Sequence, residues 1–126
     1  MDERDRHKEG LKVRRAVLGE TYVERAQAAE NEFNSAFQDL ITRYAWGEIW
    51  TRPGLTRKTR SLITIAMMVA LNRGEELKMH IRAALQNGVT REELREVLLQ
   101  TAVYCGVPAA NAAFHLTEQV LSEMEE

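Results

Sequence analysis

The sequence Arg57-Lys-Thr-Arg-Ser-Leu-Ile-Thr-Ile-Ala-Met-Met-Val-Ala-Leu-Asn72 decides the fold, because it contains the longest apolar run of the chain. From Leu62 to Leu71 only Thr64 is polar, and the apolar side chains point all round a helical axis instead of along one stripe. This pattern predicts a helix over about 57–72, capped by Thr56, that is central and buried. The run is too short to cross a bilayer.

Clear helix signals follow on the C-terminal side of this segment. A helix is expected over about 75–87, with Asn87-Gly88 as its left-handed cap. Thr90-Arg-Glu-Glu93 is a capping box that opens a further helix, and Gly106 stops that helix. Pro108 suits the first turn of a last helix.

Helix signals also precede the segment. Residues 5–18 predict a helix that Gly19 caps, and Thr21-Tyr-Val-Glu24 is a capping box for a shorter one. An amphipathic helix is expected from Glu30 to Trp46, followed by a loop over about 47–56. The apolar face of this helix consists of Phe33, Phe37, Leu40, Ile41 and Tyr44.

The composition agrees with an all-α protein. Seven glycines and two prolines are few for the turns of an all-β design. Seventeen Lys and Arg against nineteen Asp and Glu give a formal charge of −2, which argues against nucleic acid as a partner. The single cysteine, Cys105, excludes an internal disulfide and a CxxC pair. We expect one domain over residues 1–126, an all-α helical bundle of five to seven helices.

The ends and the size of the chain predict its location and assembly. The charged start Met1-Asp-Glu-Arg-Asp-Arg6 predicts no signal peptide, so we expect a soluble, cytoplasmic protein that does not enter membranes. A domain of this size buries only about two-thirds of its unfolded surface. The apolar run over 62–71 exceeds what a small monomer needs, so we expect a homo-oligomer.

His80 is the first candidate for catalysis. It borders the apolar stripe of the helix expected over 75–87, and Glu76 lies four residues earlier on the same face. A carboxylate beside a histidine raises the proton affinity of the imidazole and orients it, which suits general acid–base catalysis. The alternative is a surface pair that adds roughly a few tenths of a kcal/mol to helix stability.

The segment Trp46-Gly-Glu-Ile-Trp-Thr-Arg-Pro-Gly-Leu55 is the second candidate. It places both tryptophans together with Glu48 and Arg52 in the expected long loop, where polar functional groups are often found. The alternative is that Trp46 and Trp50 only pin the loop onto the bundle.

The third candidate is the break Tyr104-Cys-Gly-Val-Pro108, which precedes Asn111 and His115. Free N–H groups at the start of the last helix can bind an anion, and a thiol beside them favours the thiolate. The alternative is that Cys105 packs between apolar neighbours, and that His115 is a partly buried helix residue. The three histidines have no metal-ligand spacing and no glycine-rich phosphate loop occurs, so we expect no metal or nucleotide site.

Three stretches resemble the carboxymuconolactone decarboxylases, in the order and with the spacing of that family. The resemblance covers about residues 20–120. The stretches are Trp46-Gly-Glu-Ile-Trp-Thr-Arg-Pro-Gly-Leu-Thr-Arg-Lys-Thr-Arg-Ser-Leu-Ile-Thr-Ile-Ala66, Glu76-Leu-Lys-Met-His-Ile-Arg-Ala-Ala-Leu-Gln-Asn-Gly-Val-Thr-Arg-Glu-Glu-Leu-Arg-Glu-Val97 and Gln100-Thr-Ala-Val-Tyr-Cys-Gly-Val-Pro-Ala-Ala-Asn111.

The resemblance implies an all-α fold of the alkylhydroperoxidase-D-like type, assembled as a trimer or trimer-based hexamer. It also implies loss of CO₂ from 4-carboxymuconolactone to give β-ketoadipate enol-lactone, a step of protocatechuate breakdown. The implied partner is thus a small carboxylated lactone, and no cofactor is expected. Redox relatives carry Cys-x₂-Cys-x₃-His, which places their cysteines at Arg73 and Glu76 of this chain. Neither residue can do thiol chemistry, so peroxidase activity of that kind is disfavoured.

The implied reaction needs no electron sink from the protein. The two electrons left by the departing carboxylate spread through the C=C bond into the lactone carbonyl. The protein must hold two carboxylates, stabilise the enolate oxygen and deliver a proton to carbon. The guanidinium of Arg52 suits a carboxylate clamp, with Arg60 or Arg73 as substitutes.

His80 is the expected general acid and enolate stabiliser, with Glu76 or Glu48 setting its proton. Tyr104 is expected to donate a hydrogen bond to the lactone oxygen. Two alternatives remain open: a family member acting on another lactone or a keto-acid, and a non-catalytic oligomeric or redox-accessory protein. Convergence of Glu76, His80 and Arg52 on one cleft, within or across subunits, would favour the enzyme.

Overall fold

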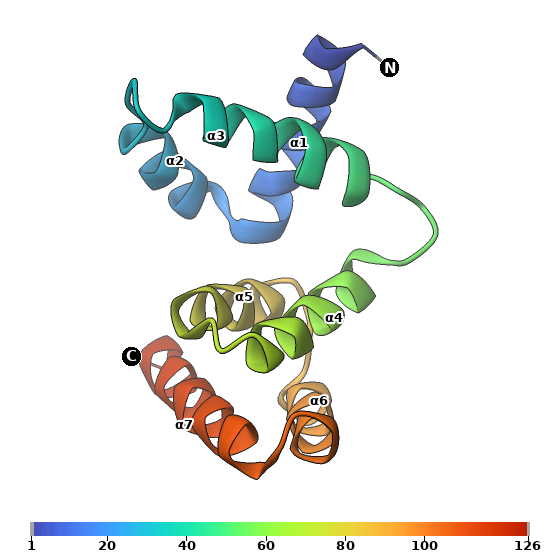
Figure 1. Cartoon of the computed structure of the whole chain (residues 1–126), viewed down its shortest axis with the longest axis vertical. Coiled ribbons are helices and arrows are strands. Elements are labelled where there is room, and N and C mark those ends of the chain that lie inside the picture. Colours follow the sequence, from blue (N-terminus) through green and yellow to red (C-terminus); the bar gives the residue numbers. More distant parts are fainter. Residues whose placement is uncertain (1, 126) are drawn as a thin grey trace. The chain divides into compact units, whose positions relative to one another are not determined.

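A computed structural model describes residues 2–125 and is all-α, as the sequence predicts (Figure 1). No strand occurs within this range, and none of its helices is both long and apolar enough to cross a membrane. The helices are α1 (Glu3–Leu18), α2 (Glu20–Ala28), α3 (Ser35–Ile41), the π-helix η1 (Thr42–Ile49), α4 (Arg57–Ala70), α5 (Gly74–Gln86), α6 (Arg91–Tyr104) and α7 (Val107–Met124).

The chain divides into two compact units, which are described separately. The N-terminal unit ends at Arg57 and contains α1, α2, α3 and η1. The C-terminal unit begins at Lys58 and contains α5, α6, α7 and nearly all of α4. The extent of the predicted single domain stays a prediction.

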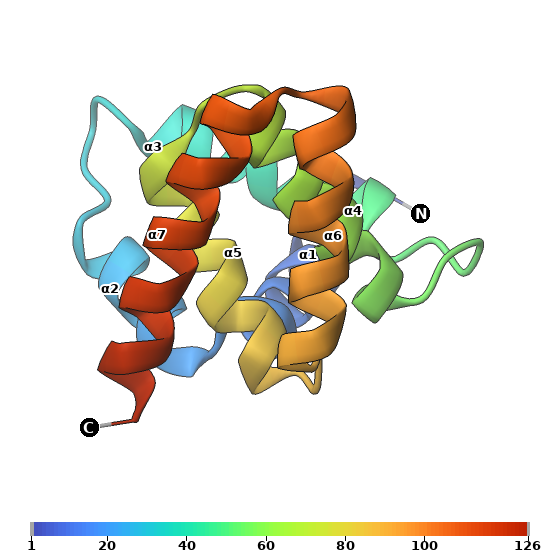
Figure 2. The same cartoon turned by 90° about the horizontal axis from the view of Figure 1, so that it is seen from below.

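The C-terminal unit is built around one apolar core. Helix α7 packs against both α5 and α6, and Figure 2 shows α6 and α7 running antiparallel beside each other. Burying these side chains is the main stabilising contribution to such a bundle. The buried core residues are Ile65, Val69, Leu77, Ile81, Ala84, Val89, Leu94, Leu98, Ala113 and Val120.

Local signals place the helix ends of this unit where the sequence predicts them. Gly88 follows α5 with φ +94°, and Gly106 precedes α7 with φ +101°, both left-handed values that favour glycine. Thr90 and Glu93 form the predicted capping box: Glu93 N–H donates to Thr90 Oγ1 at 3.1 Å, and Thr90 N–H donates to Glu93 Oε1 at 2.9 Å. Pro108 lies in the first turn of α7.

Helix α4 is less buried than predicted. Only the stripe Ser61, Ile65 and Val69 is buried within the described chain. Met67, on the opposite side of the helix, is 54% exposed, and Leu71, directly after it, is 60% exposed. One unit of this size offers α4 partners on one side only, so an all-round apolar helix keeps an uncovered face.

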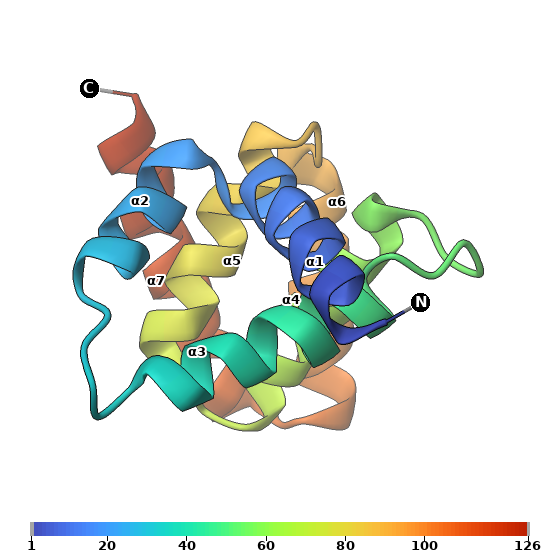
Figure 3. The ribbon, with the colours of Figure 1, turned by 90° about the horizontal axis from the view of Figure 1, so that it is seen from above.

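The N-terminal unit depends on a close crossing of α1 and η1, which Figure 3 shows where α1 meets the end of the helix that begins as α3. A Cβ added at Gly10 would lie 2.1 Å from the carbonyl oxygen of Thr42 and 2.8 Å from the amide nitrogen of Gly47. A Cβ added at Gly47 would lie 2.4 Å from the carbonyl oxygen of Arg6. The two backbones can approach this closely only because neither residue has a side chain.

Three predictions for the N-terminal unit are wrong in detail. Helix α2 begins at Glu20 without a side-chain cap, so the predicted Thr21 capping box does not form. The amphipathic helix starts at Ser35, because the Asn31 side chain accepts hydrogen bonds from the N–H groups of Phe33 and Asn34 and makes a turn there.

The same helix also continues further than predicted. It runs through η1 to Ile49, and Trp50 N–H donates to the carbonyl of Ala45, five residues back, at 3.0 Å. The loop therefore covers 50–56 instead of 47–56. The apolar face that the sequence predicts for this helix is largely exposed: the side chains of Phe33 and Tyr44 are 97% and 58% accessible. Periodicity alone cannot tell whether a partner covers such a face.

Gly10→Ala should destabilise the protein. Alanine in place of glycine normally stabilises a helix by about 1 kcal/mol, but here its Cβ meets backbone atoms, and such overpacking costs about 1–3 kcal/mol or more. The 2.1 Å approach to a backbone oxygen puts the cost at the upper end of this range, so we expect a net loss of about 2 kcal/mol in the free energy of unfolding, measured by urea denaturation followed by circular dichroism. Gly54→Ala is the matched control, since nothing lies within 4 Å of its added Cβ. Equal stability of the two variants would contradict the close crossing.

Candidate active site around His80

Helix α5 carries the central candidate residues. Glu75 and Glu76 lie in its first turn, where carboxylates interact favourably with the helix dipole. Its inner face buries Leu77 and Ile81 in the core of the C-terminal unit. His80 precedes Ile81 directly, so its ring lies half-buried at the border of this face. It is neither sealed in the core nor fully in solvent.

Two opposing effects set the proton affinity of His80. Burial lowers the pKa of the imidazole below its usual 6.5, and the nearby charge of Glu76 acts in the opposite direction. Within residues 2–125 no side chain or backbone group hydrogen-bonds to the ring. At neutral pH the free protein therefore holds an uncharged imidazole whose nitrogens remain available to a ligand, next to a carboxylate that supports its protonation when a negative charge binds.

Three further predicted residues lie in the same unit. Arg60 is half-buried on α4, and Arg73 is exposed immediately before α5. Tyr104 ends α6 and is 82% exposed. No hydrogen bond or ion pair links Arg73 or Tyr104 to His80 within residues 2–125. Their roles in binding stay predictions.

Glu48 and Arg52 belong to the N-terminal unit. Glu48 is exposed on η1 and not in a loop, whereas Arg52 is exposed in the segment 50–56. Trp46 is buried, and its ring centroid lies 4.9 Å from that of Trp50. This packing supports a pinning role for the two tryptophans. The convergence of Glu48 and Arg52 with His80 stays a prediction.

The turn between α6 and α7 shows one difference from expectation. Cys105 is a half-buried free thiol, and Asn111 is exposed on α7. His115 is exposed, so its predicted partial burial is wrong. The reason is helical geometry: Ala113 and Thr117 lie on the buried face of α7, and a residue midway between them points to the other side. No group of three metal-binding side chains occurs within residues 2–125.

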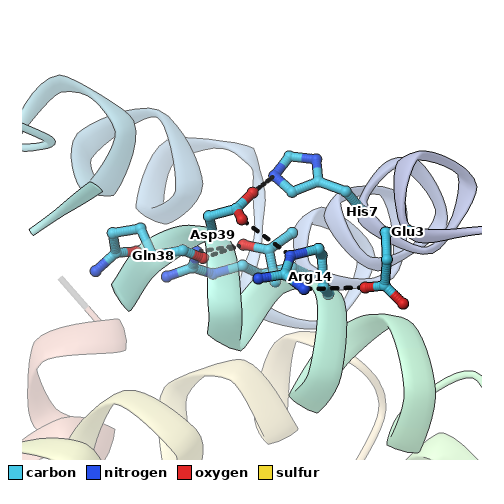
Figure 4. Close-up of polar contacts among 7 residues, drawn as sticks. Glu3, His7, Arg14, Gln38 and Asp39 are labelled. Carbon is cyan, nitrogen blue, oxygen red and sulfur yellow. Dashed lines mark hydrogen bonds and ion pairs between the residues drawn. The ribbon is translucent and has the colours of Figure 1, made fainter. Parts of the chain in front are cut away.

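A polar cluster in the N-terminal unit was not among the predicted sites (Figure 4). His7 Nε2 lies 3.4 Å from an Asp39 carboxylate oxygen, and Arg43 bridges Asp39 and Glu3 at 2.9 Å each. Arg14 on α1 is buried beside this cluster. One signal was available: Arg14 falls on the helical stripe of Val13 and Val17, where a charged residue is unusual.

The fold and the half-buried histidine define a class of small all-α protein whose candidate catalytic imidazole lies on a core helix, one turn after a carboxylate. The sequence matches the carboxymuconolactone decarboxylase family over residues 35–119, a segment that includes α3 to α6 and most of α7. The chain belongs to this family.

Two relatives are similar over most of the chain, and a third is similar over a shorter segment. A 4-carboxymuconolactone decarboxylase of Acinetobacter baylyi is 52% identical over 124 residues, which cover 98% of this chain and 92% of the relative. A nitrosuccinic acid decarboxylase of Metarhizium robertsii is 46% identical over 116 residues, covering 92% and 81%. A 4-carboxymuconolactone decarboxylase of Pseudomonas putida is 50% identical over 48 residues, 38% of this chain and all of that sequence.

The imidazole of His80 should titrate below pH 6.5 in the folded protein. An NMR titration of its ring C–H signals measures this midpoint, and Glu76→Gln should lower it further by removing the supporting charge. Because the unfolded chain then binds more protons, stability should rise with pH from the folded midpoint up to about pH 6.5. Glu75→Gln removes an equal charge from a neighbouring position and is the matched control. A midpoint above 6.5 in the wild type would mean that the charge of Glu76 outweighs burial, and it would contradict the expected downward shift.

Proposed function

We propose that this chain is a cofactor-independent carboxy-lyase that converts 4-carboxymuconolactone and a proton into CO₂ and β-ketoadipate enol-lactone, in aromatic compound catabolism. One observation carries the proposal: the 52% identity to a relative named for this activity, over nearly the full length of both chains. The cytoplasm, where such a small acid would be met, is the proposed location.

The chemistry of the substrate explains why the side chains of this protein suffice. The C–C bond to the ring carboxylate breaks, and its electron pair moves through the C=C bond onto the lactone carbonyl oxygen. The resulting enolate accepts one proton at the carbon next to the carbonyl. The difficult requirement is stabilisation of the enolate oxygen, which positioned hydrogen-bond donors and positive charges supply.

His80 is the proposed donor to the enolate and the source of the proton. Its ring is uncharged in the free protein because burial lowers its pKa. A substrate with two carboxylates brings negative charge close to the ring and raises that pKa, so the imidazole becomes protonated when it is needed. Glu76 supports the same protonation. Glu48 is the substitute for Glu76 in this role.

Arginines are the proposed carboxylate clamp. Arg52 is the first choice, with Arg60 and Arg73 as substitutes, because a guanidinium donates two parallel hydrogen bonds to a carboxylate. Tyr104 is the proposed donor to the lactone oxygen. Its high exposure means that in this proposal another copy of the chain closes the site over it.

A homo-oligomer, a trimer or a hexamer, is part of the proposal. The C-terminal unit leaves Val103 and Val107 75% and 70% exposed beside Tyr104, and α4 leaves Leu71 uncovered. Large apolar side chains that gather on a surface favour contact with another protein surface. A second copy would bury them and shield the site from water.

A second candidate substrate is nitrosuccinic acid, which the name of the 46% identical relative suggests. This acid also carries two carboxylates, and its nitro group accepts the electron pair as the lactone carbonyl does. The same histidine and arginine clamp therefore suit both reactions.

The purified protein should release CO₂ from 4-carboxymuconolactone without added metal or nucleotide. The assay follows CO₂ together with loss of lactone absorbance, and nitrosuccinic acid is tested in parallel. Faster turnover of nitrosuccinic acid would favour the second candidate. No CO₂ from either acid would reject decarboxylation of both substrates and favour a different substrate or a non-catalytic role.

His80→Ala should lower turnover at least about tenfold, since removal of one positioned donor commonly costs about two to three decades in rate. His115→Ala removes a histidine that is exposed on α7 and should keep wild-type turnover. Gel filtration must show the same oligomer for both variants. Near-normal turnover of His80→Ala would reject the assignment of the general acid.

A further inference from the structure

Arg14 is a buried charge without a charged partner. Its side chain lies on α1 and is 7% exposed. Its Nη1 donates to Gln38 Oε1 at 3.2 Å and, more weakly, to Thr42 Oγ1 at 3.5 Å. Both acceptors are neutral. Among residues 2–125, no carboxylate lies within ion-pair distance of Arg14.

One edge of the Arg14 guanidinium is unused. The Nε–H group is buried and has no acceptor. Nη2 forms no hydrogen bond with any residue from 2 to 125 either. Nε and Nη2 together form the edge of a guanidinium that matches the two oxygens of a carboxylate, or two oxygens of an inorganic oxyanion.

The nearest acidic residues do not supply the missing charge. Asp39 is engaged by Arg43 Nε at 2.9 Å and by His7 Nε2 at 3.4 Å. Figure 4 shows the contact between His7 and Asp39. Burial lowers the pKa of Arg14 and is the larger effect, while the nearby Tyr22 and Glu30 act in the opposite direction and raise it. Leaving a charge buried without a paired group costs several kcal/mol. A ligand that supplies the paired charge would recover part of this cost.

A cavity of about 80 Å³ lies at this place, between α1, α2 and α3. Arg14, His7, Gln38 and Thr42 line it together with the carboxylates of Glu30 and Asp39. The volume exceeds the space of one water molecule, about 30 Å³ in the liquid, and suits an anion of about four or five heavy atoms. The amide of Gln38 and the ring of His7 provide further hydrogen-bonding groups around the guanidinium.

We propose that this cavity is a binding site for one small oxyanion, a short carboxylate or inorganic phosphate, held on the Nε–Nη2 edge of Arg14. The site is separate from the catalytic residues proposed above and does not depend on the reaction. All residues that line it belong to the N-terminal unit, so one copy of the chain contains the whole site. Binding places a negative charge in direct contact with Arg14, which neither Glu30 nor Asp39 provides.

The direct test is an NMR titration of the purified protein with sodium acetate at constant ionic strength, and separately with inorganic phosphate. The Arg14 Nε–H signal should shift and saturate, because a new acceptor occupies the unused edge. Chloride at equal ionic strength is the reference. A saturating shift with acetate alone assigns a carboxylate, and one with phosphate alone assigns an inorganic oxyanion. No saturating shift with either anion overturns the proposal and leaves a water-filled cavity.

Variants give a second, independent readout through the anion-dependent rise in Tm. Arg14→Met should abolish this rise. Arg15→Met is the matched control: Arg15 Nε pairs with Glu20 at 3.4 Å, so its loss should leave the rise unchanged. Glu30→Gln should strengthen anion binding, because it removes a nearby negative charge that repels the ligand.

Gln38→Glu keeps the proposal testable if Arg14→Met does not fold. It places a carboxylate at a position that already contacts Nη1. We expect this variant to have a higher Tm than the wild type without anion and to lose the response to acetate and phosphate. A lower Tm together with an unchanged anion response would overturn the proposal, because the charge of Arg14 would then not be what the cavity lacks.

Discussion

The backbone contact between Gly10 and Gly47 is the constraint on which the N-terminal unit depends. A Cβ on either residue would lie within 2.4 Å of a carbonyl oxygen of the other helix. Helices α1 and η1 can therefore cross at this distance only if both positions are glycine. The crossing brings Thr42 against α1, and its hydroxyl faces Arg14 one turn further along. A steric requirement at two glycines thus helps create the environment in which a guanidinium is buried without a carboxylate at ion-pair distance.

The C-terminal unit shows a second compromise between packing and polarity, at His80. The helix that carries it buries Leu77 and Ile81 in the core, and the imidazole at the border of this face is therefore partly buried. Burial favours the neutral ring, and Glu76 favours the protonated one. A group held between two such influences can change its protonation when a ligand brings charge, which is the property that acid–base catalysis requires.

Sequence reasoning succeeded where the deciding interaction is local. The Thr90–Glu93 capping box and the ends of α5 and α7 at Gly88 and Gly106 depend on residues within one turn, and all were predicted. Sequence reasoning failed where contact with residues far away along the chain determines the length of a helix or the exposure of its face. The extension of the helix through η1 depends on contact with α1, and the exposure of the Phe33–Tyr44 face depends on what covers it. Of the site, the neighbourhood of Glu76 and His80 was predictable because both lie on one helix.

The sequence by itself determined the all-α class, most helix ends, the position of Glu76 one turn before His80 and the absence of a second thiol, because these follow from periodicity, capping and composition. Only the tertiary structure decided that Arg14 is buried beside a cavity, that His115 is exposed, and that α4 is buried along one of its faces and not all round. The physical reason is that burial is a property of what packs against a residue, and that neighbour is usually far away along the chain.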